Sequence, residues 1–135
     1  MAQARASIGT IDYVVSITAG RHALTADERI EDGGRDSGPT PSELLCAALC
    51  ACTSITLRMY ARHKGWPLRA LHVDVHSVQD ERETAMTRSV TVVGDLDSQQ
   101  HARLADIVER TPVTLTLKRG ARITTTLTTQ MENVS

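Results

Sequence analysis

The feature that most constrains this chain is a long apolar segment with a clear helix start and a clear helix stop. Thr40 and Glu43 have the spacing of a capping box, and Pro41 stands at the first helical position, where its missing N–H costs nothing. Residues 44–52 are all apolar or small, and Gly65 is a typical helix stop. The pattern predicts one long central helix that is buried on most sides along its first half.

The remaining elements follow from hydrophobic alternation and from turn residues. β-Branched residues and a period of two predict strands, Gly20 predicts a hairpin turn, and residues 31–39 are too rich in Gly and Asp for regular structure. Strands are expected at residues 10–19, 22–26, 68–78, 88–94 and 121–129, and a shorter amphipathic helix at residues 98–110. We therefore predict an α+β fold with antiparallel sheets, formed as a single domain over residues 1–135.

Charge and composition disfavour several partners. The net charge is −1 with both signs interspersed, which gives no electrostatic footprint for nucleic acid or an anionic membrane. We expect no apolar run approaching the roughly 18 residues of a membrane span, and residues 1–10 lack the apolar middle of a secretory signal. These features predict a cytoplasmic protein. Aromatic residues are only 2% of the chain, and the small aliphatic core that results favours burial in an oligomer.

All three cysteines lie within the predicted central helix, which is unlike a disulfide scaffold and indicates reduced thiols. At about 100° per residue, Cys46 and Cys50 share a helix face, whereas Cys52 points about 200° away from Cys50. No CxxC pair or neighbouring histidine completes a tetrahedral site, so we predict no metal and no cofactor. We interpret Cys46 and Cys50 as small buried hydrophobes, and Cys52 as the thiol most exposed to a polar cavity.

A resemblance extends this interpretation. The string GGRDSGPTPSELLCAALCACTSITLRMYA at residues 33–61, followed by KGWPL at residues 64–68, resembles the OsmC/Ohr family of organic hydroperoxide-handling proteins, and its OsmC-like redox branch in particular. The similarity runs from about residue 17 to residue 127. It implies an α+β fold in which two chains intertwine into a homodimer, with active sites at the interface and Cys52 as the peroxidatic cysteine.

The resemblance also implies a departure from the family at the second cysteine. In the family the sulfenic acid formed on the first cysteine is captured by a cysteine just before a Pro-Val pair. The matching stretch here is VERTPVTLTL at residues 108–117, in which Thr111 occupies that position. Cys46 and Cys50 cannot replace it without unwinding the helix. An external thiol would therefore have to resolve the oxidised Cys52.

Two further family positions assist the reactive thiol. Arg21 matches the arginine after the hairpin glycine, and we favour it over Arg35 as the group that stabilises the thiolate and orients the peroxide. The family's glutamate lies ten residues before the cysteine, where this chain has Ser42, and Glu43 lies nine before. Glu43 is therefore either a catalytic residue or only the third residue of the capping box.

These observations lead to three functional hypotheses. In the first, Cys52 reduces organic hydroperoxides or related small electrophiles, assisted by Arg21 and an external thiol reductant. In the second, a catalytically degenerate relative binds a small hydrophobic molecule in the dimer-interface pocket. In the third, the protein is a dimeric scaffold without a ligand. A Cys-His hydrolase is not supported, because no histidine is placed as a base for Cys52.

Overall fold

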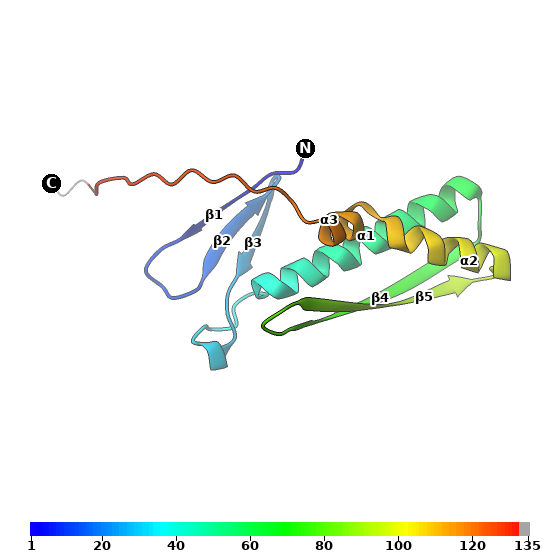
Figure 1. Cartoon of the computed structure of the whole chain (residues 1–135), viewed down its shortest axis with the longest axis horizontal. Helices are drawn as coiled ribbons and strands as arrows, with labels where there is room; N and C mark the ends of the chain where they lie inside the picture. Colours follow the sequence, from blue (N-terminus) through cyan, green and yellow to red (C-terminus); the bar gives the residue numbers. More distant parts are fainter. Residues whose placement is uncertain (133–135) are drawn as a thin grey trace.

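The computed structural model describes residues 1–132, and within them the chain forms two antiparallel sheets and three α-helices (Figure 1). The elements in chain order are β1 (Ala4–Ile8), β2 (Val15–Ala19), β3 (His22–Ala26), the 3₁₀ turn η1 (Ile30–Asp32), α1 (Pro41–Lys64), β4 (Leu68–Gln79), β5 (Thr84–Gly94), α2 (Ser98–Ile107), the 3₁₀ turn η2 (Val108–Arg110) and α3 (Pro112–Arg119). The predicted α+β class, with a long central helix and a second, shorter one, is confirmed.

The N-terminal sheet is a meander in the order β1-β2-β3, which projects beyond the start of α1 and away from the rest of the chain (Figure 1). The hairpin at Gly20 is confirmed, with Ala19 paired to His22. The strand predicted at residues 10–19 is too long, because Tyr13 has a φ of 71° and regular pairing begins only at Val15. β1 was not predicted, since two of the three apolar residues in its short, exposed ARASI sequence are alanines, which are depleted in strands.

The second sheet is the β4–β5 hairpin, and it forms a two-layer body with the helices (Figure 1). Val73 pairs with Val90, and the side chains of alternate residues turn inward beneath α1 and α2. Leu57 of α1 and Leu104 of α2 are buried between the layers at 1% and 3% exposure. The two predicted strands are therefore confirmed, although β5 begins four residues earlier than expected, at Thr84.

The central helix begins and ends where its sequence predicts. The Thr40 hydroxyl accepts a hydrogen bond from the Glu43 N–H at 3.2 Å, Glu43 Oε1 accepts one from the Thr40 N–H at 2.9 Å, and Gly65 has a φ of 71°. Within the single chain, however, the first half of the helix is not buried on most sides. Leu45 is 43% exposed and Ala47, Ala48 and Ala51 are also exposed, because the layers of a single chain cover only the opposite face of α1.

The length and composition of α1 also correct the expectation about membrane-spanning segments. An 18-residue window of this helix has a mean hydropathy of 1.6, so α1 is long and apolar enough to cross a membrane by those criteria alone. The expectation concerned uninterrupted apolar runs, whereas the mean hydropathy of a window stays high when Thr and Ser residues interrupt the run. Only 22% of this window is buried within the chain. Most residues of this window are therefore exposed or only half-buried in a single chain.

The C-terminal part of the chain departs from prediction in two ways. Residues 112–119 form α3, which was not predicted, although Thr111 and Pro112 repeat the Thr-Pro signal that starts α1. The strand predicted at residues 121–129 is wrong, because this segment has no regular structure in the described chain. Its alternating Thr, Ile and Leu residues meet no neighbouring strand, and a strand requires a hydrogen-bonded partner.

Asp27 organises the loop that carries the chain from β3 to the start of α1. Asp27 is only 2% exposed. Its carboxylate accepts hydrogen bonds from the N–H groups of Glu28, Arg35 and Ser37, at 2.7, 3.2 and 3.1 Å. It also accepts one from the Ser37 hydroxyl at 2.6 Å. These bonds satisfy backbone donors that no regular element would pair. The predicted loop at residues 31–39, which also contains part of η1, is thus folded around one carboxylate.

Asp27 predicts a pH-dependent stability. The Ser37 hydroxyl and the surrounding N–H groups lower the pKa of Asp27 to about 2, from 3.8 in the unfolded chain. Because the folded-state pKa is the lower one, this stabilisation is complete above about pH 4 and is lost as the pH falls towards 2. We expect the melting temperature of the wild type to fall more steeply over this range than that of Asp27→Asn, measured by circular dichroism. The exposed-site control Asp74→Asn should keep the wild-type slope, and an equally steep slope in Asp27→Asn would contradict the prediction.

Candidate active site

Cys52 lies midway along α1, on the side that faces the start of α3. Its side chain is half-buried, and its sulfur accepts a hydrogen bond from the Val113 N–H at a Sγ to N distance of 3.4 Å. The Thr56 hydroxyl, one turn further along α1, lies 3.9 Å from the same sulfur. The thiol is thus held by a backbone donor from a segment 61 residues away in the chain.

The donor belongs to the N-terminus of a helix, which favours negative charge. Thr111 is the N-cap of α3 and Pro112 is its first residue, so Val113 is among the first residues of the helix, whose N–H groups have no partner within it. One such N–H points at the sulfur, and the positive end of the helix dipole lies in the same direction. The Cys52 sulfur therefore lies at the N-terminal end of α3, in contact with one of its free N–H groups.

Thr111, which stands where the resemblance places a second cysteine, is fully buried. Its hydroxyl oxygen accepts a hydrogen bond from the Thr114 N–H at 3.3 Å and lies 2.6 Å from the Thr114 hydroxyl. The side chain acts as the N-cap of α3 and offers no thiol to Cys52. The residue at this position therefore serves the helix that holds the sulfur.

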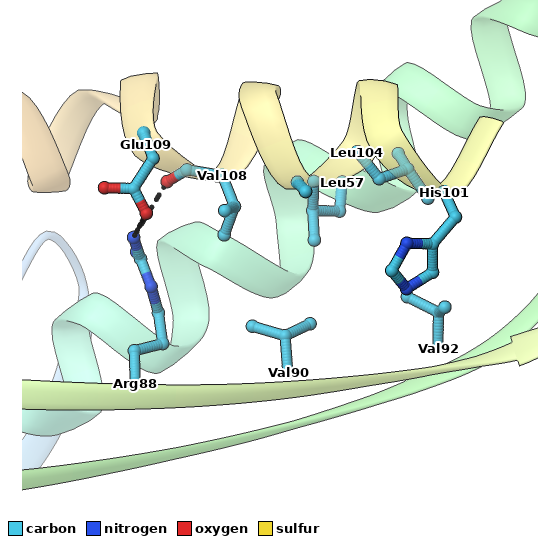
Figure 2. A pocket seen from close by; sticks show the side chains of 9 residues that line it. Leu57, Arg88, Val90, Val92, His101, Leu104, Val108 and Glu109 are labelled. Atoms are coloured by element: carbon cyan, nitrogen blue, oxygen red, sulfur yellow. Dashed lines mark hydrogen bonds and ion pairs between the residues drawn. The ribbon is translucent and has the colours of Figure 1, made fainter. Parts of the chain in front are cut away.

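The residues that follow Cys52 and Val113 in the chain belong to a polar cluster centred on Arg88, which sequence reasoning missed. Nη1 of Arg88 donates hydrogen bonds to the hydroxyls of Thr53 at 2.9 Å and Thr114 at 2.8 Å, and Nη2 donates to the Val108 carbonyl at 2.9 Å. Figure 2 shows Arg88 reaching from β5 towards Val108 and Glu109. The only sequence signal is an arginine at an inward-facing position of a strand, between the inward-facing Met86 and Val90.

The Arg88 guanidinium, whose side chain is 11% exposed, also lies 3.5 Å from the Glu109 carboxylate. Glu109 in turn accepts a hydrogen bond from Lys118 at 2.9 Å. That bond, with the positive charges of Lys118 and Arg88, holds the pKa of Glu109 below its ordinary value. Arg88, Glu109 and Lys118 thus form a chain of alternating charges from the buried arginine to the surface of α3.

Glu43 lies at the start of α1 and takes part in the capping box. The Thr40 N–H is the main reason that the pKa of Glu43 is lowered. Nine residues separate it from Cys52, which corresponds to about 13 Å along a helix. Its role as a cap is confirmed, and its catalytic role stays a prediction.

Arg21 lies in the exposed turn between β2 and β3, on the sheet that projects from the body of the chain. In the described part of the chain, no hydrogen bond or ion pair joins it to Cys52. A single chain therefore does not assemble Arg21, Glu43 and Cys52 into one site, and the role of Arg21 also stays a prediction.

The helix geometry that separates the three thiols is confirmed. Cys50 faces the sheet, with its sulfur 3.7 Å from the Val73 carbonyl oxygen, whereas Cys52 faces α3. All three cysteines are free thiols. Cys46 and Cys50 are half-buried and not fully buried as expected, because α1 is covered on one side only.

Two pockets adjoin the Arg88 cluster. One, of about 280 Å³, lies between β5 and α2 and is walled by Val90, Val92 and Leu104 (Figure 2). The other, of about 520 Å³, lies between the starts of α1 and β5 and the end of α3. Its apolar residues are Leu45, Leu49, Met86 and Leu117, and its charged residues are Arg88, Glu109 and Lys118. The second pocket is large enough for a small organic molecule.

Solved structures share this fold. An OsmC-like protein from Mycoplasma pneumoniae is 17% identical, with a TM-score of 0.75 and coverage of 87% of each chain. An organic hydroperoxide resistance protein, OsmC, from Legionella pneumophila is 20% identical, with a TM-score of 0.64 over 89% of this chain and 90% of its own. An OsmC-like protein of unknown function from Vibrio cholerae is 10% identical, with a TM-score of 0.68 over 86% and 92%.

No curated protein matches the chain. The family comparison is more decisive, because the sequence model of the OsmC-like proteins matches residues 34–126, about two thirds of the chain and the whole of the Cys52, Arg88 and α3 region. Family membership supports a redox or peroxide-resistance role at the level of the family. This chain belongs to the family of OsmC-like proteins.

Proposed function

We propose that this protein reduces organic hydroperoxides through Cys52, with an external thiol completing the cycle. The observation that carries the proposal is the hydrogen bond from the Val113 N–H at the start of α3 to the Cys52 sulfur. Such a donor stabilises the thiolate, which is the form of cysteine that attacks an electrophile. The family relationship supports peroxide as the electrophile.

The reaction has two stages. The Cys52 thiolate attacks the outer oxygen of the hydroperoxide, the O–O bond breaks, and the departing alkoxide takes a proton to leave as the alcohol, while Cys52 becomes a sulfenic acid. An external thiol then condenses with the sulfenic acid to give a mixed disulfide and water. A second external thiol attacks that disulfide, which releases the Cys52 thiol and an external disulfide. Thr111 takes no part in this electron transfer, because it has no sulfur.

We further propose that the working unit is a homodimer in the reducing cytoplasm. Three free thiols in one chain are typical of a reducing compartment. The exposed apolar face of α1, which includes Leu45, Ile55 and Met59, supports a partner chain as its cover. In a dimer, the projecting sheet that carries Arg21 would also be able to pack against the partner chain.

Stoichiometric oxidation tests this function. Reduced protein is mixed with one equivalent of cumene hydroperoxide, and the cysteines are mapped by mass spectrometry with and without a sulfenic-acid trap. We expect Cys52 to carry the sulfenic acid, and added small thiol to convert it to a mixed disulfide. An unmodified Cys52 under these conditions would contradict the proposal.

A second function has one observation in its favour. The pocket of about 520 Å³ offers four apolar residues and a rim of mixed charge. The residue that stands where the family has its second cysteine is Thr111, as expected of a relative that binds a small hydrophobic molecule without redox chemistry. The two functions separate in Cys52→Ser. This variant should lose all peroxide reactivity. Ligand binding would be favoured if the variant binds an apolar fluorescent probe as well as the wild type does and Cys52 of the wild type does not react with peroxide.

A further inference from the structure

We infer that Arg88 is a positioning residue for Cys52, which it orients by tying α1 and the start of α3 to one guanidinium group. This inference rests on the proposed reactivity of Cys52. It assigns a role to a residue that lies outside the helix carrying the thiol.

Arg88 contacts the residues next to both partners of the Cys52–Val113 contact. The two groups that define the Cys52 environment are the sulfur on α1 and the Val113 N–H on α3, 3.4 Å apart. The residues that follow them in the chain are Thr53 and Thr114, and one nitrogen of Arg88, Nη1, bonds to both hydroxyls at 2.9 and 2.8 Å. The separation of sulfur and N–H is therefore set by two bonds to a single atom.

Each hydroxyl of this cluster has a partner. Arginine is only a donor, so both threonine hydroxyls must accept from it and donate elsewhere. Thr53 donates to the Leu49 carbonyl at 2.7 Å, and the Thr114 hydroxyl has two acceptors within reach, the Thr111 hydroxyl at 2.6 Å and the Val108 carbonyl at 3.5 Å. Within residues 1–132, no buried side-chain nitrogen or oxygen lacks a partner. A fully satisfied buried network holds one geometry in preference to others.

Burial makes the tie effective. Thr53 and Thr114 are 0% and 5% exposed, so their hydroxyls depend on partners within the protein. The second nitrogen, Nη2, anchors the Val108 carbonyl and so fixes the segment that leads into Thr111 and α3. Lysine could not reproduce this fork, because an ammonium is a single point charge on a flexible stem.

The experiment compares Arg88→Gln and Arg88→Lys with the wild type by two readouts that do not require peroxide. The first is the alkylation rate of Cys52 by iodoacetamide, resolved by mass spectrometry from those of Cys46 and Cys50. The second is hydrogen exchange of the Val113 amide, measured by NMR. We expect both variants to alkylate Cys52 on the order of 10- to 100-fold more slowly and to exchange the Val113 amide faster. Arg103→Gln, which removes an exposed arginine from α2, should match the wild type in both.

Isosteric variants keep the test decisive if Arg88 variants fail to fold. Thr53→Val and Thr114→Val each remove one acceptor of Nη1 while preserving side-chain volume, and each should slow Cys52 alkylation and speed Val113 exchange. Folded Arg88 or threonine variants with wild-type values in both readouts would overturn the inference. An absence of sulfenic acid in the wild type would instead overturn the proposed function, and the alkylation and exchange results would still decide the role of Arg88.

Discussion

Replacing Cys52 with serine is expected to lower the rate of cumene hydroperoxide consumption by on the order of 10³-fold or more. Serine preserves the size of the side chain and can accept the hydrogen bond that the Val113 N–H donates to sulfur. Its hydroxyl stays protonated at neutral pH, however, and is a poor nucleophile towards a peroxide oxygen. The rate is measured from the loss of hydroperoxide with excess dithiol as reductant.

Cys46→Ser and Cys50→Ser are the matched controls, because they make the same change on the same helix. Cys50 faces the Val73 carbonyl in the sheet, away from α3, so neither variant should change the rate by more than about threefold. A comparable loss in either control would show that the thiols act together. Undiminished consumption by Cys52→Ser would remove Cys52 from the chemistry altogether.

Placing a charge on the uncovered face of α1 is the second large effect that we expect. Ile55 is 55% exposed in the single chain and lies on the same face as Met59, which is 66% exposed. If a second copy covers this face, Ile55→Glu would bury a carboxylate without a partner, at a cost of several kcal/mol. The dimer dissociation constant should then rise by at least about 100-fold, as measured by sedimentation velocity over a range of concentrations.

The control for this experiment is Arg82→Glu, at the exposed turn between β4 and β5. It reverses a charge where we expect no partner contact, and it should leave the dimer unchanged. A wild type that sediments as a monomer at high concentration would contradict the homodimer. A dimer that persists in Ile55→Glu would show that the interface lies on another face of the chain. Loss of the dimer together with loss of peroxide consumption would connect assembly to the Cys52 site.

Much of the fold could be predicted because its signals are local. The capping box, Pro41 and Gly65 define α1 within a few residues of its own ends, and alternation along β4 depends only on neighbouring side chains. The same Thr-Pro signal begins α3 at Thr111, so this helix was predictable in principle.

Non-local contacts account for what was missed. Residues 121–129 alternate like a strand, yet pairing requires another strand at the right place, which the described chain does not supply. The apolar run of α1 predicts burial, but which of its faces is covered depends on the number of layers packed around it. Arg88 contacts residues 20 to 35 positions away, and no short motif encodes such a meeting.

By itself the sequence determined the central helix, the free state of its thiols and the separation of Cys52 from Cys46 and Cys50, because helix geometry and caps depend on residues a few positions apart. Only the tertiary structure decided what surrounds Cys52. It brought the start of α3 to the sulfur and Arg88 to the threonines beside it, because packing a helix against a sheet joins groups that are distant in the chain. The residue that holds this site together is therefore on a strand, and not on the helix that carries the thiol.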